Sequence, residues 1–275
     1  MLVNLREILA PTEAGKYAVP AFNVYNTETV MGIIRAAEEL KAPVIIQMYS
    51  RLFSNEEAYY VAPAILAAAQ KAKVPVCFHL DHGANYEAVA RAVRYGCTGV
   101  MIDASACPLE ENIRQTKAVV DMCEQMDIPT EGELGHVGTT ADEHMGEFTK
   151  VDEAVEFVNR TCVAALAVMV GTAHGRYKQA PKLDIQRIAD IKEAVKIPLV
   201  LHGGSGIPED QVKASIEAGI RKVNFGTDVC FSFLDAVFAA PRDKYAIDMF
   251  MKPVVEAVAD FAREKIRLLG AENRA

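Results

Sequence analysis

Three histidines occupy comparable places in the sequence, each at the end of a short apolar run and each followed directly by glycine. They are His82, His174 and His202. Imidazole nitrogen is a good ligand for Zn²⁺, and three protein ligands with one open position are typical of a catalytic zinc site. One histidine at the end of a strand is more often structural, but three in the same setting indicate a shared metal site.

Asp81 precedes the first of these histidines. A carboxylate at this place either orients a neighbouring imidazole or acts as a general acid and base toward a substrate on the metal, and its position favours the second role. On a regular strand its side chain should point away from that of His82 while staying at the same rim. We interpret His79 as structural or supporting, and His136 and His144 as weaker ligand candidates.

A glycine-rich turn, Gly203-Gly-Ser-Gly-Ile-Pro208, leads into a helical segment. Glycines let backbone N–H groups approach a phosphate, and the amino end of a helix favours an anion. Such turns are common, so this signal is weak alone. It gains weight beside Asn224–Thr227, because phosphate sites after strands seven and eight recur in (β/α)₈ barrels.

Eight short apolar runs alternate with segments of helical periodicity. The runs are mostly continuous in hydrophobicity, as in parallel strands covered on both faces. They span residues 17–25, 43–49, 74–81, 98–103, 128–134, 165–171, 197–202 and 221–227. This predicts an α/β fold, a (β/α)₈ TIM barrel. An open doubly wound sheet is the rival, but no GxGxxG follows the first strand. In a barrel the polar strand ends converge on one rim.

The segment from Pro241 to Ala275 does not repeat this unit. Val254, Val255, Val258, Phe261 and Ile266 form a helical stripe that ends at Gly270. We expect additional C-terminal helices, with the terminal helix packed on the barrel or on another subunit. The 275 residues contain no low-complexity linker, so residues 1–275 are expected to form a single domain.

Composition excludes some classes of function. The net charge of −8 argues against a nucleic-acid surface, and the apolar runs are too short to span a membrane. Met1 is followed by Leu-Val-Asn-Leu-Arg-Glu, which lacks the features of a secretory signal. The six cysteines are scattered without a CxxC pair, so we expect reduced thiols in a cytoplasmic protein.

Several motifs identify a family resemblance. In order, they are His79-Leu-Asp-His-Gly83, Val100-Met-Ile-Asp103, Glu131-Gly-Glu-Leu-Gly135, Gly171-Thr-Ala-His-Gly175, Leu201-His-Gly-Gly-Ser-Gly206 and Lys222-Val-Asn224. Over nearly its whole length the chain resembles the class II, metal-dependent ketose-bisphosphate aldolases. It is more similar to the branch of tagatose-bisphosphate and deoxyketogluconate-phosphate aldolases than to the longer fructose-bisphosphate enzymes.

The resemblance implies one catalytic Zn²⁺ at His82, His174 and His202, with Asp81 moving the proton of the C4 hydroxyl. Asp103 and Glu133 match positions that can approach a second or shifted metal position. A phosphorylated ketose would be cleaved to dihydroxyacetone phosphate and an aldehyde, the metal stabilising an enediolate without a lysine Schiff base. The phosphate of dihydroxyacetone phosphate would be held by Gly175, Gly203, Gly204, Ser205, Asn224, Phe225, Gly226 and Thr227. A monovalent cation, Na⁺ or K⁺, near this phosphate and a homodimer or homotetramer are also implied.

The chain departs from the family pattern at the loop acid and at residues expected to shape the substrate pocket. Relatives carry an acidic residue on the loop after the Glu-Leu-Gly motif; here it would be Asp142 or Glu143 in the polar stretch 139–149. A long loop of this kind in a barrel is more often functional than a mobile surface segment. Tyr49, Ser50 and Arg51 would narrow or recharge the pocket, and Arg176 replaces a frequent apolar residue. Arg51 or Arg176 would bind a distal phosphate, carboxylate or sulfonate, unless both are solvated surface arginines.

Two other functions fit the histidines. A metal-dependent barrel hydrolase would use the same ligands around a metal-bound water, and chelator-sensitive release of a triose phosphate would distinguish an aldolase from it. A non-catalytic regulatory homologue would bind zinc and cleave no ketose phosphate. The phosphate-type turns and the intact set of proposed ligands favour the aldolase.

Overall fold

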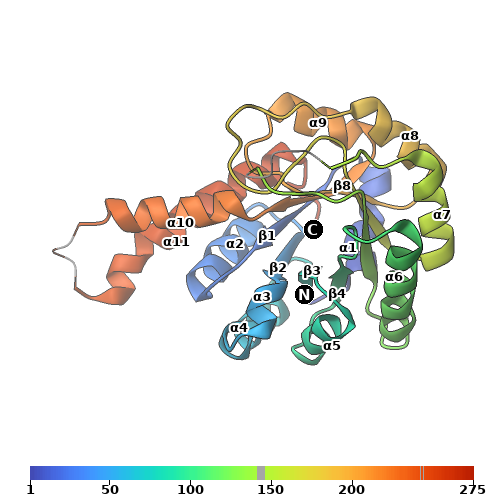
Figure 1. Ribbon diagram of the computed structural model, residues 1–275. Coiled ribbons are helices and arrows are strands. Elements are labelled where there is room, and N and C mark those ends of the chain that lie inside the picture. The colour runs from blue at the N-terminus through green and yellow to red at the C-terminus, as the bar shows by residue number, and fades with distance from the viewer. Residues whose placement is uncertain (141–145, 242, 244) are drawn as a thin grey trace.

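The computed structural model describes residues 1–140, 146–241, 243 and 245–275. Its strands form a closed, fully parallel barrel in the order β1-β2-β3-β4-β5-β6-β7-β8 (Figure 1). The (β/α)₈ prediction is therefore confirmed, and each predicted run overlaps one strand, although β3 continues two residues beyond its run and β8 begins one residue before its run. The strands are β1 Val19–Asn23, β2 Val44–Tyr49, β3 Val76–Gly83, β4 Gly99–Ile102, β5 Thr130–Leu134, β6 Ala165–Val168, β7 Leu199–Leu201 and β8 Ile220–Phe225.

Helices cover the outside of the barrel, which explains why the strands are continuously apolar. Almost every strand residue is buried, because one face meets the barrel interior and the other meets a helix. The helices are α1 Leu5–Gly15, α2 Thr27–Glu39, α3 Ser50–Ser54, α4 Glu57–Lys71, α5 Tyr86–Arg94, α6 Leu109–Glu124, α7 Val151–Thr161, α8 Ile185–Val195, α9 Glu209–Ala218, α10 Thr227–Ala239 and α11 Ile247–Leu268.

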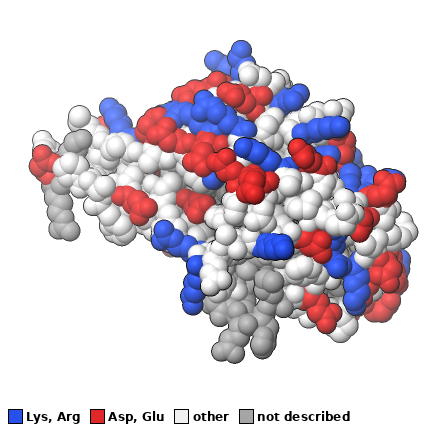
Figure 2. Space-filling model, turned by 90° about the horizontal axis from the view of Figure 1, so that it is seen from above, with Lys and Arg blue, Asp and Glu red and all other residues white. Residues whose placement is uncertain are grey.

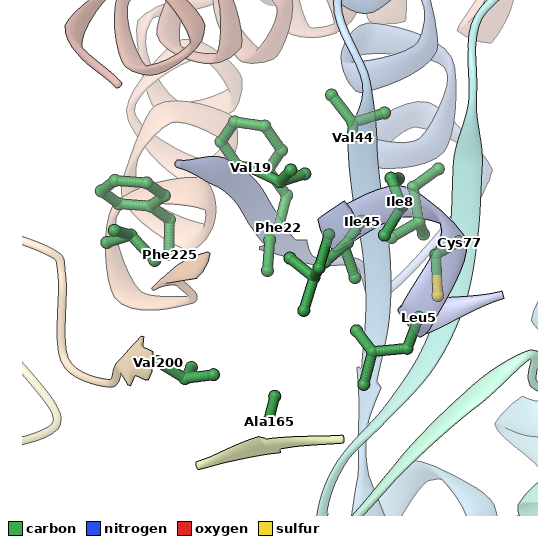
Figure 3. Packing of buried hydrophobic residues seen from close by; sticks show 14 of the residues in the cluster. Leu5, Ile8, Val19, Phe22, Val44, Ile45, Cys77, Ala165, Val200 and Phe225 are labelled. Atoms are coloured by element: carbon green, nitrogen blue, oxygen red, sulfur yellow. The ribbon is translucent and has the colours of Figure 1, made fainter. Parts of the chain in front are cut away.

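Helix α1 lies at the amino-terminal end of the barrel, opposite the predicted site. The Leu5 N–H donates to the Thr98 carbonyl just before β4, and Leu5 and Ile8 join the same core as the strand residues. Figure 3 shows this core around Val19, Phe22 and Cys77. With this end of the barrel packed by side chains, the carboxyl end of the strands is left for chemistry.

Helices α10 and α11 form an arm that projects from the barrel beside α2 (Figure 1). The predicted stripe on α11 is confirmed at Val254, Val255, Val258 and Ile266, which are all buried. Phe261 is partly buried and lies edge-on to Phe22 and Phe225, with ring centroids 6.1 Å apart in each pair. The part of α11 from Val254 to Ile266 therefore packs into the core of the barrel.

The outer part of the arm is apolar and exposed. Its large exposed side chains are Leu234, Phe238 (80%), Tyr245 (95%), Ile247 (77%) and Met249. Figure 2 shows acidic and basic side chains mixed over the barrel, whereas most of the arm on that face carries neither. Large exposed apolar patches are uncommon on monomeric proteins and are typical of interaction surfaces. Throughout the described residues, helices fall short of the length or apolar character needed to cross a bilayer.

Candidate active site

The carboxyl ends of the strands enclose a cavity of about 340 Å³. Its walls come from the strand ends and from the segments that follow them, as expected for a barrel enzyme. The lining residues include Asn23, Tyr25, Tyr49, Arg51, Asp81, His82, Asp103, His136, His174, Gly175, Gly203, Ser205, Asn224, Gly226 and Thr227. Most residues selected from the sequence therefore come together around one space.

The three histidines meet at this cavity: His82 and His174 line it, and the fully buried His202 contacts His82. The ring centroids lie 4.8 Å apart for His82 and His174, 4.7 Å for His82 and His202, and 5.7 Å for His174 and His202. One nitrogen from each ring lies within 4.8 Å of the other two. Nε2 of His174 is buried and has no hydrogen-bond partner among the residues that the structure describes, which is costly unless a ligand satisfies it. These residues therefore fit a divalent metal ion.

Carboxylates fix which ring nitrogens face this point. Nδ1 of His82 lies 2.7 Å from Oδ2 of Asp103, and Nε2 of His202 lies 3.0 Å from Oε1 of Glu131. An ionised carboxylate only accepts hydrogen bonds, so these ring nitrogens carry the protons. The opposite nitrogens, His82 Nε2 and His202 Nδ1, then face each other at 2.9 Å. Each offers its lone pair to a metal once no proton lies between them. This is the usual arrangement of histidine ligands.

The surrounding charges separate the pKa values of the histidines. Burial alone would lower the pKa of His82, but Asp81, the hydrogen bond to Asp103 and Glu133 raise it to about 10. Burial and the neighbouring His82 lower the pKa of His174 to about 4 and hold that of His202 well below its usual range. Without metal, one proton is therefore held on His82, and it must leave before that ring binds a cation.

Asp103 and Glu133 lie beside His82 and form a second group able to hold a metal, His82-Asp103-Glu133. Burial and the nearby Asp103 raise the pKa of Glu133 to about 8. Burial would also raise the pKa of Asp103, but the hydrogen bond and charge of His82 hold it well below its usual range. The Ser105 hydroxyl lies 2.7 Å from Asp103 Oδ1 and 2.9 Å from Glu133 Oε1, linking the two carboxyl groups.

Asp81 reaches the cavity together with His82, so the prediction that its side chain points away was wrong. Its Oδ1 lies 4.0 Å from Nε2 of His82. The pairing of β3 with β4 is irregular between Leu80 and Gly83, and His82 has a φ of 49°. This left-handed backbone breaks the strict alternation of strand side chains, so two consecutive residues line one space.

Two amides hold the Asp81 carboxylate. Asn23 donates to its Oδ2 at 2.8 Å and Asn224 donates to its Oδ1 at 3.2 Å. Gln47 in turn donates to Oδ1 of Asn23 at 2.9 Å, which directs the Asn23 amide nitrogen toward Asp81. Asp81 as a whole residue is 4% exposed. It is thus oriented by neutral donors and still reaches the cavity.

The predicted phosphate-binding segments lie along one wall. Gly175, Gly203, Ser205, Gly226 and Thr227 line the cavity. At Gly203, with a φ of 65°, an added Cβ would lie 2.3 Å from the Ala173 carbonyl oxygen, so a larger residue would displace this turn. Thr227 begins α10, and the first N–H groups of a helix can bind an anion where nothing else accepts from them. The Asp228 N–H already donates to the Ser205 hydroxyl at 3.1 Å.

Two members of the predicted phosphate set do not line the cavity. The Gly204 N–H is already donated to the Asn224 carbonyl at 3.0 Å. The Phe225 side chain packs in the core against Phe22, with ring centroids 5.7 Å apart (Figure 3). Their part in the wall is to shape the backbone of neighbouring residues.

The two candidate specificity arginines lie in different places. Arg51 lines the cavity, with its Cζ 5.1 Å from the centre of the Tyr49 ring, and that ring lies 5.8 Å from the ring of His82. Arg176 packs over Phe231 of α10 at 4.6 Å and is absent from the lining. Ser50 is buried at the start of α3. Asp142 and Glu143 lie outside the described residues.

Sequence reasoning assigned no function to several residues that the fold brings to the site. Asn23 and Gln47 are polar residues near the ends of predicted strands. A polar residue at that position is typical of a barrel active site and could have identified both. His136 differs from these residues because the sequence offered it as a weaker ligand candidate; it lines the cavity, with Nδ1 3.0 Å from the Ser105 hydroxyl. Glu131 and Lys222 lie inside predicted strands and each begins one of the family motifs, but neither was given a role.

Comparison with known proteins agrees with this geometry. Residues 3–274 match the family described as fructose-bisphosphate aldolase class-II. The sequence is 41% identical over 279 residues to YdjI of Escherichia coli K12, covering 100% of both chains. The X-ray structure of the YdjI aldolase matches with a TM-score of 0.91 at 38% identity, again over 100% of both chains. A fructose-bisphosphate aldolase from Campylobacter jejuni shares the fold, with a TM-score of 0.84 at 21% identity over 100% of this chain and 97% of that one. The chain therefore belongs to the class II fructose-bisphosphate aldolase family and is an aldolase, a carbon–carbon lyase.

Proposed function

We propose that the protein is a cytoplasmic, zinc-dependent aldolase that reversibly cleaves a ketose 1-phosphate or 1,6-bisphosphate to dihydroxyacetone phosphate and an aldehyde. The observation that carries this proposal is the placement of Asp81 beside three histidines whose free nitrogens converge. A bound Zn²⁺ would act there as a Lewis acid toward the substrate oxygens. His82, His174 and His202 would hold it.

Asp81 would take the proton of the C4 hydroxyl during cleavage and return it during condensation. The amides of Asn23 and Asn224 hold its two oxygens in place, so the carboxylate need not reorganise as the proton moves. Cleavage of the C3–C4 bond leaves an enediolate, and a separate acid must protonate it at C3. We propose Asp142 or Glu143 for this step. Asp103 and Glu133 are proposed to offer the second metal position.

The phosphate of dihydroxyacetone phosphate would lie against Gly175, Gly203, Ser205 and Thr227. All four line the cavity, and Thr227 begins a helix that runs away from it. Main-chain N–H groups at such a turn neutralise an anion without a lysine or arginine. We propose that Na⁺ or K⁺ adds positive charge beside this phosphate.

The distal end of the substrate would lie near Arg51. This guanidinium lies over Tyr49 on the side of the cavity formed by the end of β2, whereas the phosphate segments follow β6, β7 and β8. An arginine fork suits a phosphate, carboxylate or sulfonate. Because Arg176 packs on Phe231 and does not line the cavity, Arg51 is the better candidate for substrate selection.

We also propose that the protein is a homodimer or homotetramer assembled through the arm of α10 and α11. Phe238, Tyr245 and Ile247 are each more than three-quarters exposed. Covering such side chains is favourable by about 25 cal/mol per Å² of apolar surface. A second copy of the chain offers the same surface, as a two-fold interface requires.

Zinc binding should release protons. Because the pKa of His82 is raised to about 10, the metal-free protein keeps the imidazole of His82 doubly protonated at neutral pH. The protonated ring stabilises the folded state fully below the usual pKa of about 6.5, and this stabilisation is lost as pH rises through the raised value. We expect at least about one proton released per zinc near pH 7.5, and an affinity that rises with pH. Calorimetry in two buffers of different ionisation enthalpy measures this. Zinc binding without proton release would contradict the assignment.

Replacing Asp81 with asparagine should separate two activities. We expect kcat for cleavage to fall by about 10²- to 10⁴-fold, the usual range for a lost general acid and base, with zinc content unchanged. Deuterium exchange at the hydroxymethyl carbon of dihydroxyacetone phosphate should persist, because it involves no C4 hydroxyl, and chelation should abolish both. Cleavage is read as dihydroxyacetone phosphate released from a panel of ketose phosphates. A zinc-loaded wild-type protein with neither activity would refute the proposed function.

Arg51→Met should lower kcat/KM by about 10- to 100-fold on substrates with a distal anion, consistent with about 1.5–3 kcal/mol for a hydrogen bond to a charged group. Substrates with an uncharged distal end should be little affected. Arg176→Met is the matched control and should leave kcat/KM unchanged. The same panel, including carboxylate and sulfonate analogues, provides the test. If both variants behave as wild type on the best substrate, neither arginine selects it.

The double substitution Phe238→Ser and Ile247→Ser should weaken self-association by at least about tenfold, since it removes two large apolar side chains from the arm. Sedimentation equilibrium gives the dissociation constant. Tyr59→Ser on α4, which also replaces an exposed aromatic side chain (68%), is the control and should have no effect. A monomeric wild-type protein, or equal effects of both changes, would overturn the arm as the interface.

A further inference from the structure

A lysine lies inside the barrel directly beneath the candidate active site. Lys222, on β8, is 0% exposed and is among the largest fully buried side chains. It does not line the cavity. A buried ammonium group is unfavourable unless it is paired, so its partners indicate why it is there.

The Lys222 ammonium contacts two polar side chains, one on β5 and one on β8. It forms an ion pair with Oε2 of Glu131 on β5, at 2.9 Å, and both side chains are fully buried. It also donates to Oδ1 of Asn224, two residues further along β8, at 2.9 Å. One cation therefore touches two residues that each contact the proposed catalytic groups.

The first connection leads to the metal site. The other carboxylate oxygen of Glu131 accepts from Nε2 of His202 at 3.0 Å. This places the proton of His202 on Nε2 and leaves Nδ1 toward the other histidines. Lys222 fixes the position of Glu131, and Glu131 fixes the ring of His202.

The second connection leads to Asp81. An asparagine side chain has one accepting and one donating end, and an ammonium group only donates. Lys222 therefore holds the oxygen of Asn224 toward itself. The amide nitrogen is left facing Oδ1 of Asp81, at 3.2 Å.

We propose that Lys222 is a positioning residue that orients both the metal ligand His202, through Glu131, and the proton-transferring Asp81, through Asn224. It is not a nucleophile, since its nitrogen is paired and does not reach the cavity. This inference rests on the proposed function. It assigns the aldolase a lysine that acts through other residues.

The test compares Lys222→Met with the double variant Glu131→Gln/Lys222→Met, in which no unpaired charge is left buried. Lys192→Met is the control, since Lys192 on α8 pairs with Glu13 of α1, away from the cavity. The readouts are the zinc dissociation constant by chelator competition, the Tm of the metal-free protein, and kcat for cleavage at saturating zinc.

If Lys222 is a positioning residue, zinc affinity falls by about 10- to 100-fold in Lys222→Met, the usual cost of losing support for a ligand, and kcat falls as well. The double variant recovers most of the lost Tm but keeps weak zinc binding and low kcat. Lys192→Met keeps both at wild-type values. If Lys222→Met does not fold, the zinc dissociation constant and kcat of the double variant decide whether Lys222 is a positioning residue.

A purely structural role predicts a different result. Then Tm changes, while the zinc dissociation constant and kcat of the double variant stay within about threefold of wild type, and the proposal for Lys222 is overturned. The proposed function is unaffected by that outcome. If wild-type protein itself binds no zinc, the proposed function fails first and the inference fails with it.

Discussion

Closure of the barrel is the constraint on which the site depends. The pairing of β1 with β8, in which Ala21 lies opposite Asn224, brings together residues from the two ends of the strand order. Asn23 from β1 and Asn224 from β8 then reach Asp81 from different directions. In an open sheet these two strands would lie at opposite edges. A closed barrel thus gives one carboxylate two fixed donors.

Closure also creates an interior in which charges are confined. Glu131, Lys222 and His202 are fully buried. Lys222 pairs with one carboxylate oxygen of Glu131, and His202 donates to the other. Removing one member of a buried ion pair typically costs about 3–5 kcal/mol, because its partner is left unpaired. That is a large part of the stability of an ordinary domain. The site is therefore held by partners that are each costly to lose, and its geometry is correspondingly rigid.

The fold could be predicted from the sequence because its signals are repeated. Eight apolar runs of strand length alternate with helical segments, and the stripe from Val254 to Ile266 predicted the terminal helix. The convergence of the three histidines followed from their shared place at strand ends. The direction of Asp81 could not be predicted, since the irregularity near His82 depends on how β3 pairs with β4. The separation of Arg51 from Arg176 also required tertiary structure, because Phe231 lies on a helix distant in sequence.

The left-handed backbone of His82 limits how the candidate metal site can change during evolution. Among residues with a side chain, histidine, asparagine and aspartate adopt such a conformation far more readily than others. We therefore expect position 82 to accept asparagine or aspartate in place of histidine, which would exchange an imidazole for an oxygen ligand and favour harder cations. Cysteine and glutamate lack this conformational advantage. A descendant of this protein with a different metal preference would most easily arise by a substitution at this residue, without rebuilding the strand around it.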